Sequence, residues 1–329
     1  MAASMSRFEE VARQALAAYG LEGAAPTFIR HSGSAAFRVE APGSDGYLLR
    51  LHIPITSAMG SHSADAAMVR SELQWLEALN DDTELVLQRP VRNREGDLVT
   101  TVPVGAGALH CSLLRWLPGE PYHRDRQTED TARQIGRILA TLHRHAAAWQ
   151  PSPGWRRPAR DAAYFEGVLW ALRPAVEDGR IARDDYVELA KAVAQLVDRM
   201  GELPRHPGVH GVMHADAHKG NMLLDGGEIR LIDFSFCATG NYMFDLGFCL
   251  SDMSPALHGA FVEGYRGVRP LPEGWAELAE GFFLGAMVGT FSFWVPRPEA
   301  REHLVAMVPR IVQEYALRYN RGEPFWPYA

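Results

Sequence analysis

The chain has 329 residues, enough for two lobes or two domains, and 47% hydrophobic with 22% charged residues is ordinary for a globular protein. A net charge of −7 argues against a general nucleic-acid binder, and no apolar run is long enough to span a membrane. No signal peptide is recognisable, and Cys111, Cys237 and Cys249 lack the spacing of a metal site or a disulfide framework. We therefore expect a cytoplasmic protein with buried thiols.

The first elements in chain order are a helix and three short strands. Residues 6–19 have helical periodicity, with Ser6 and Glu9 as a predicted capping box. Strands are predicted at 27–30, 36–40 and 47–53. The turn between the first two contains Ser32, Gly33 and Ser34, whose backbone N–H groups can contact phosphates, although such a turn also suits an ordinary hairpin.

Two charged residues stand out in the next elements. Arg50 lies in the middle of the third strand, and no lysine precedes Lys191, so any phosphate-binding cation in this strand would be Arg50. A helix is predicted over 63–80, with Glu72 near its middle. The alternative interpretation is a surface arginine and an exposed helical glutamate.

The middle of the chain changes from strands to helices. Two short strands are predicted within 85–104 and another over 109–117, before Pro118-Gly119. Helices are predicted at 128–149, 161–173, 183–200, 255–266, 274–296 and 299–319. His143 and His145, near the end of the first of these, are expected to interact with that helix terminus rather than with a metal.

Residues 212–233 carry the clearest chemical signal. Apolar residues flank Asp225-Gly226-Gly227, and Asp-Gly between apolar runs is a strong hairpin signal. The hairpin would return the chain so that Asp233 at its exit lies near Asn221 at its entry. Asp216 lies in the loop just before, so the three side chains are expected to converge.

An Asp, an Asn five positions later and an Asp twelve positions after that are typical of phosphoryl transfer. One carboxylate can accept the proton of an attacking hydroxyl. The amide oxygen and the second carboxylate can hold Mg²⁺ against nucleotide phosphates, since Mg²⁺ prefers hard oxygen ligands. A lone Asp-Asn pair would be ordinary loop chemistry, but the preceding His214 and the following hairpin favour the catalytic interpretation.

This stretch resembles the aminoglycoside phosphotransferase family, whose fold is shared with choline kinases and, more distantly, protein kinases. The family forms are H-G-D-x-H-x-x-N and I-D-F or I-D-W. Here they read His-Ala-Asp-Ala-His-Lys-Gly-Asn over 214–221 and Ile-Asp-Phe over 232–234, with Ala215 in place of the usual glycine. The resemblance covers about residues 26–270.

The resemblance implies an α+β, two-lobed, protein-kinase-like fold. Residues 1–117 would form a nucleotide-binding lobe with an antiparallel sheet and one major helix, and residues 118–329 a mainly helical catalytic and acceptor-binding lobe. Asp216 would be the catalytic base, and Asn221 and Asp233 the metal ligands. His214 and Asp245 would support the catalytic loop.

The resemblance also implies ATP and Mg²⁺ as cofactors. Arg50, paired with Glu72, and the 32–34 turn would position the phosphates. The residues expected to line the base pocket follow the last strand of the first lobe: Arg115, Trp116 and Leu117, with Leu114 before them.

The implied reaction moves the γ-phosphoryl group of ATP to a hydroxyl of an aminoglycoside-, choline- or homoserine-like small molecule. A protein Ser/Thr kinase is the first alternative, but no activation segment is recognisable after Asp233. A non-catalytic nucleotide-binding regulator is the second, but it would not need the intact Asp216, Asn221 and Asp233 set. The acceptor and the oligomeric state stay open, because acceptor contacts would lie in the C-terminal helices.

Overall fold

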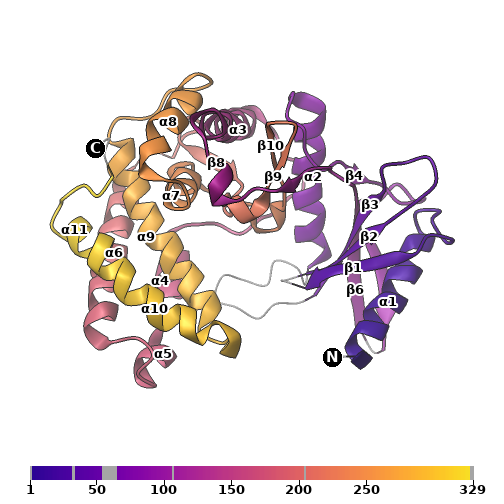
Figure 1. Ribbon diagram of the computed structural model, residues 1–329, viewed down its shortest axis with the longest axis horizontal. Coiled ribbons are helices and arrows are strands. Elements are labelled where there is room, and N and C mark those ends of the chain that lie inside the picture. The colour runs from indigo at the N-terminus through magenta and orange to yellow at the C-terminus, as the bar shows by residue number, and fades with distance from the viewer. Residues whose placement is uncertain (1, 32–33, 54–64, 106, 204, 327–329) are drawn as a thin grey trace.

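The computed structural model describes residues 2–31, 34–53, 65–105, 107–203 and 205–326. A sheet with one flanking helix forms one end of the molecule and a helical bundle forms the other, with α2 (Ala66–Asp82) between them (Figure 1). The predicted α+β class is therefore confirmed.

The sheet is antiparallel, in the order β1-β2-β3-β6-β4, with β5 also paired to β6. Its strands are β1 (Pro26–His31), β2 (Ser34–Val39), β3 (Tyr47–His52), β4 (Pro90–Val91), β5 (Thr100–Val104) and β6 (Gly107–Arg115). Phe37, Leu49 and Leu113 belong to a core cluster with the helix α1 (Ala2–Ala17). Arg50 stands opposite Ala36 and Ser112 in the register, so these three share the other face, towards the bundle.

Both helices of this part begin differently from the sequence prediction. Helix α1 begins at Ala2, so Ser6 lies inside it and the predicted capping box is wrong. Val11, Ala15 and Leu16 of this helix belong to the core cluster under the sheet, and this burial outweighs the local capping signal. Helix α2 is capped by Asp65, whose carboxylate accepts a 2.8 Å hydrogen bond from the Ala67 N–H.

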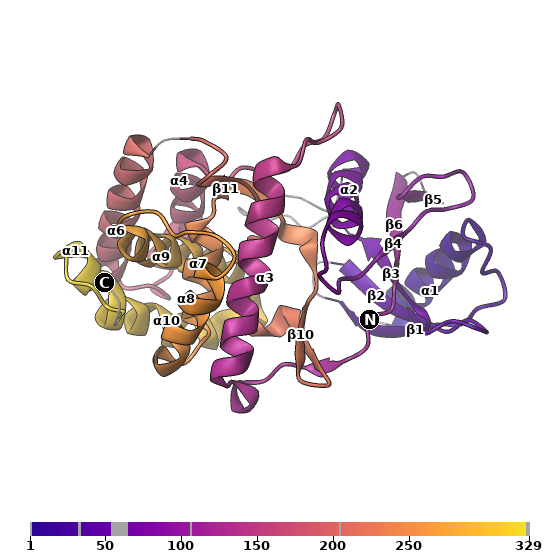
Figure 2. The same cartoon turned by 90° about the horizontal axis from the view of Figure 1, so that it is seen from above.

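The second part is mainly helical. Its helices are α3 (Glu129–Ala148), α4 (Ala162–Trp170), α5 (Arg173–Glu177), α6 (Arg183–Glu202), α7 (Met243–Ser251), α8 (His258–Arg266), α9 (Trp275–Trp294), α10 (Arg301–Ile311) and α11 (Leu317–Asn320). Five short strands lie among them: β7 (Glu120–Pro121), β8 (His210–Met213), β9 (Met222–Asp225), β10 (Glu228–Leu231) and β11 (Ala238–Asn241). Figure 2 shows α3 running along the side of the bundle that faces the sheet.

The close packing of α3 against α8 positions residues behind the active site. Gly136 faces the carbonyl of Phe261, and Gly264 faces the carbonyl of Arg133, so a Cβ at either glycine would collide with backbone. This approach brings His143 of α3 to Tyr265 of α8.

Helix α9 is buried along most of its length, as expected for the core of a bundle. In the described ranges no helix combines the length and apolarity required to cross a bilayer. Cys111, Cys237 and Cys249 are free and buried, as predicted.

Candidate active site

The β9–β10 hairpin brings the predicted residues together. Its strands pair from Met222–Leu231 to Asp225–Glu228, and Gly226 and Gly227 turn the chain with φ values of 59° and 93°. The Ile232 N–H donates to the Asn221 carbonyl at 2.9 Å, which closes the open end of the hairpin. Asp233 therefore follows directly from a residue bonded to Asn221, and the predicted hairpin is confirmed.

Asp216 and Asn221 form a hydrogen-bonded pair. The Asn221 Nδ2 donates to the Asp216 Oδ2 at 2.7 Å and to the Asp216 carbonyl at 3.0 Å. The amide orientation leaves the Asn221 Oδ1 as an acceptor facing away from Asp216. His218 Nε2 lies 3.7 Å from the other carboxylate oxygen of Asp216.

Asp233 is held in a left-handed backbone conformation, with φ 63° and ψ 71°. Such a conformation is disfavoured for residues other than glycine and is common at functional sites. The Ser235 hydroxyl donates to Asp233 Oδ1 at 2.6 Å, and Arg30 Nη2 lies 3.5 Å from Oδ2. The side chain is thus aimed by contacts on both sides.

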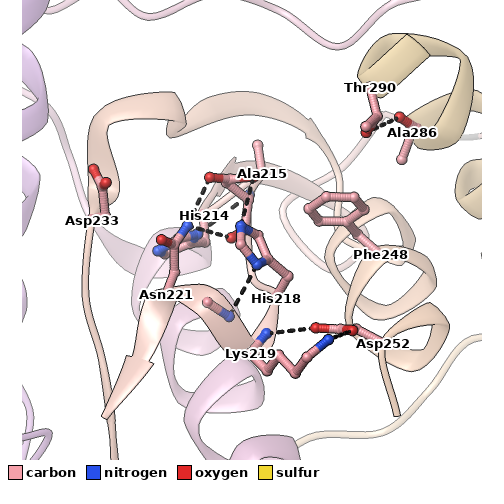
Figure 3. A network of polar contacts seen from close by, with 12 residues as sticks. His214, Ala215, His218, Lys219, Asn221, Asp233, Phe248, Asp252, Ala286 and Thr290 are labelled. Carbon is pink, nitrogen blue, oxygen red and sulfur yellow. Dashed lines mark hydrogen bonds and ion pairs between the residues drawn. The ribbon is translucent and has the colours of Figure 1, made fainter. Parts of the chain in front are cut away.

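Ala215, which replaces the usual family glycine, also has a positive φ of 60°. Its N–H donates to Asp245 Oδ1 at 2.7 Å, and the His214 N–H donates to Asp245 Oδ2 at 2.9 Å. The His214 ring lies 3.1 Å from the Ile232 carbonyl and accepts a 3.3 Å hydrogen bond from the Asp216 N–H. These bonds confirm the expected supporting positions of His214 and Asp245. Figure 3 shows His214 and Ala215 beside Asn221.

His143 belongs to the same network, contrary to the prediction that it interacts with its helix terminus. It is fully buried, with Nε2 3.0 Å from Asp245 Oδ2 and Nδ1 2.9 Å from the Tyr265 hydroxyl. Burial lowers its pKa, so the neutral ring donates from Nε2 to the carboxylate and accepts at Nδ1. His145 instead contacts Asp82 at 3.0 Å, so that prediction is wrong for both histidines.

Arg50 and Glu72 form the predicted pair. Arg50 Nη1 donates to Glu72 Oε1 at 2.7 Å, and both side chains are buried. The pair lies on the bundle side of the sheet, and the positive charge of Arg50 acts to lower the pKa of Asp233. A buried guanidinium with a carboxylate on one side can present its remaining charge to an anion on the other.

The other residues predicted to contact the nucleotide differ in their surroundings. Ser32 and Gly33 lie outside the described residues, whereas Ser34 is half-buried at the start of β2. Arg115 is exposed and donates to the Tyr47 hydroxyl at 3.1 Å. Trp116 stacks under the Arg38 guanidinium at 3.8 Å and lines a hollow beside the β2–β3 turn. Leu117 is buried but belongs to neither main core cluster.

The two carboxylates of the site have opposite electrostatic surroundings. Burial, reinforced by the charge of Asp233, raises the pKa of Asp216 to about 8. Burial also acts to raise the pKa of Asp233, but Arg50, the Ser235 hydroxyl and Arg30 outweigh it and hold that pKa below its ordinary value. One carboxyl is therefore suited to hold a proton and the other to stay ionised.

The donor set suits a hard divalent cation. Within the described residues no three His, Cys, Asp or Glu side chains gather as a complete metal site. Asp233 and the Asn221 Oδ1 are two oxygen atoms that would suit Mg²⁺, an ion that usually takes few protein ligands and completes its shell with phosphate and water. The residues therefore fit such an ion when it arrives with a nucleotide.

Two arginines that sequence reasoning did not single out lie beside the site. Arg157 donates to the carbonyls of Cys237, Ser235 and Met68 at 2.7, 2.5 and 2.9 Å. Arg160 is buried with its guanidinium 4.2 Å from the centre of the Tyr164 ring. The Arg-Arg-Pro-Ala-Arg sequence of 156–160 was the only signal available.

An antiparallel sheet joined to a helical bundle, with an Asp-Asn pair and a hairpin Asp at the junction, defines a kinase-like protein. A family model described as "Phosphotransferase enzyme family" matches residues 27–280. The chain belongs to this aminoglycoside-phosphotransferase (APH) family.

Curated relatives are similar over part of their length. The homoserine kinase of Neisseria meningitidis serogroup B is 33% identical over 218 residues, which is 63% of this chain and 64% of that protein. The amicoumacin kinase of Bacillus subtilis is 22% identical over 243 residues, covering 74% of this chain and 67% of that protein. The first alignment thus spans less than two thirds of the relative.

Solved structures match nearly the whole chain. A microcompartment-associated aminopropanol kinase superposes with a TM-score of 0.79 at 24% identity, covering 96% of this chain and 98% of that one. The amicoumacin kinase hAmiN, in complex with AMP-PNP, Ca²⁺ and Ami, gives 0.76 at 19% identity, covering 99% and 97%. These similarities confirm the kinase-like fold.

Proposed function

We propose that the chain transfers the terminal phosphoryl group of ATP to a hydroxyl group of a small molecule. The observation that carries the proposal is the 2.7 Å bond between Asn221 and Asp216, with Asp233 next to Asn221 across a closed hairpin. Membership of the phosphotransferase family supports it, as do relatives named homoserine kinase and amicoumacin kinase.

In the proposed step Asp216 orients the acceptor hydroxyl and takes its proton. The acceptor oxygen bonds to the γ-phosphorus, the bond from that phosphorus to the β–γ bridging oxygen breaks, and ADP leaves with the electron pair. Asn221 keeps the Asp216 carboxylate in place. Most of the rate enhancement then comes from positioning and charge stabilisation.

The nucleotide would lie against the first part of the chain, and we propose residues 1–117 and 118–329 as the two functional lobes. Asp233 and Asn221 would hold Mg²⁺, which supplies charge neutralisation at the phosphates when bound. The Arg50–Glu72 pair would position the phosphates. The other residues proposed to contact the nucleotide are Ser32, Gly33, Ser34, Arg115, Trp116 and Leu117.

A small acceptor is favoured over a protein acceptor by the connection after Asp233. The chain passes through one turn at Phe234–Phe236 and the short β11 directly into α7 at Met243. No long segment is available there to bind a polypeptide substrate.

The test is a screen of hydroxyl compounds with purified protein, Mg²⁺ and ATP, in which ADP formation and the mass of the phosphorylated product are both measured. Asp216→Asn, which keeps the size of the side chain, is the matched control. We expect acceptor-dependent turnover that falls by about 10²–10⁴ in the variant. Equal turnover by both proteins would refute the proposed role of Asp216.

A further inference from the structure

Two buried arginines three residues apart have opposite surroundings. The Arg157 guanidinium is bonded to three backbone carbonyls. Arg160 is only 1% exposed, yet its Nε, Nη1 and Nη2 have no hydrogen-bond partner among the residues that the structure describes. A guanidinium has five N–H donors and stays charged at any physiological pH.

Backbone contacts hold Arg160 against strand β11. Its N–H donates to the Thr239 carbonyl at 2.7 Å, next to the bridge between Ala159 and Thr239. A Cβ on Gly240 would lie 3.2 Å from the Arg160 Cβ, so the strand β11 packs directly against the arginine. The Arg160 side chain is thus held in place at its Cβ, whereas its guanidinium has no hydrogen-bond partner among the described residues.

Arg160 is connected to the catalytic loop through the sheet: its N–H bonds to Thr239 of β11, and Thr239 pairs with Val212 of β8, the strand that precedes Asp216. The positive charge of Arg160 acts to lower the pKa of both Asp216 and Tyr164. The Tyr164 hydroxyl lies over Gly289 of α9, where an added Cβ would be 2.7 Å away. Figure 3 shows that the neighbouring Thr290 of α9 lies on the opposite side of the catalytic loop from Asp233.

We infer that Arg160 binds an anionic oxygen group, a carboxylate in the first instance, on the acceptor molecule. A buried charge without a partner is strongly unfavourable, whereas a guanidinium and a carboxylate make paired, charge-assisted hydrogen bonds. The Tyr164 ring covers the guanidinium, so the acceptor has to displace this ring as it enters. The inference rests on the proposed function, because it assigns the chemistry of that function's acceptor.

The same oxyanion chemistry has a second source, which is the phosphoryl group in transfer. The two sources predict different preferences of the protein among acceptor molecules. An arginine that binds the acceptor distinguishes a carboxylate from its neutral amide, whereas an arginine that binds the phosphoryl group affects every acceptor equally.

The experiment compares matched acceptors with wild-type protein, Arg160→Gln, Arg160→Lys and the control Arg157→Gln. The pairs are L-homoserine with its carboxamide and 4-hydroxybutyrate with its amide, and 1-amino-2-propanol is an acceptor without a carboxylate. Binding is measured by calorimetry in the presence of AMP-PNP and Mg²⁺, and turnover is measured separately with ATP. Thermal unfolding of each variant checks that it is folded.

We expect wild type to bind one carboxylate acceptor about 10- to 100-fold more tightly than its amide, the factor given by a hydrogen bond to a charged group. Arg160→Gln should abolish this preference, Arg160→Lys should restore part of it, and Arg157→Gln should keep it. No preference in wild type for any pair, or equal losses with carboxylate and amide in Arg160→Gln, would overturn the inference. Binding with the expected preference but without turnover would instead refute the proposed function alone.

Discussion

Replacing Asp245 by Asn tests whether the catalytic loop depends on this one carboxylate. Asp245 is fully buried and accepts from the His214 N–H, the Ala215 N–H and His143 Nε2. An asparagine has only one acceptor oxygen, and its NH₂ group must face either the His214 or the Ala215 N–H. His143 can adjust by changing its tautomer, but a backbone N–H cannot.

The expected loss follows from these contacts. One hydrogen bond to a charged acceptor disappears and one buried N–H is left unpaired, which together lower the free energy of unfolding by about 3 kcal/mol. Either orientation of the amide removes a bond that holds the His214–Ala215 backbone, so Ala215, with its positive φ, can then relax towards an ordinary conformation. Asp216, the next residue, would move with it, and kcat should fall by at least about tenfold.

Asp252→Asn is the matched control. Among the described residues Asp252 accepts from one backbone N–H, that of Lys219 at 2.9 Å, and it also pairs with the Lys219 ammonium group. Its side chain is partly exposed, and an asparagine oxygen can take over the backbone contact, so we expect a loss below about 1 kcal/mol. Urea unfolding and steady-state kinetics of both variants decide the matter. Equal effects of the two substitutions would refute the reasoning about Asp245.

Three further predictions concern other residues. Asp233→Asn should weaken Mg²⁺-dependent binding of ATP in a calorimetric titration, and unchanged affinity would place the metal elsewhere. Arg50→Ala should raise the KM for ATP and lower kcat, with partial recovery in Arg50→Lys, since lysine retains the charge without the bidentate geometry; wild-type kinetics in Arg50→Ala would contradict its proposed role. Burial lowers the pKa of His258 from 6.5 to about 4, so between these values the unfolded chain binds a proton that the folded chain does not. The free energy of unfolding should therefore fall by about 2 kcal/mol as the pH falls from about 7 to 5, because of this residue. Urea unfolding of His258→Leu should show a pH dependence smaller by that amount. The same pH dependence in wild type and variant would refute the prediction.

The sequence predicted the site where local rules act over short distances. The hairpin between Asn221 and Asp233 follows from Asp-Gly between apolar strands, and the structure has it. The pairing of Arg50 with Glu72 was inferred from the family resemblance and from the lack of lysine, and the 2.7 Å contact confirms it. The residues needed for this prediction lie within 22 positions of each other.

The supporting contacts could not be predicted in the same way. His143 looked like a residue at a helix end, but its partners Asp245 and Tyr265 are 102 and 122 positions away. Arg157 donates to three backbone carbonyls, and a carbonyl carries no sequence signal. Arg160 differs from Arg157 only through the packing of distant strands and helices, which periodicity does not reveal.

The separation of roles between the two carboxylates has a physical basis in which element carries each one. Asp216 follows β8 inside the bundle, where Asn221 is its hydrogen-bond donor and burial raises its pKa to about 8. Asp233 leaves the hairpin towards the sheet, where the cations Arg50 and Arg30 keep its pKa low. Environments that shift the pKa values of two neighbouring carboxyl groups in opposite directions favour one group as a proton acceptor and the other as a permanent anion. Because the cations come from the sheet and Asp216 from the bundle, the proposed chemistry requires both parts of the chain in contact.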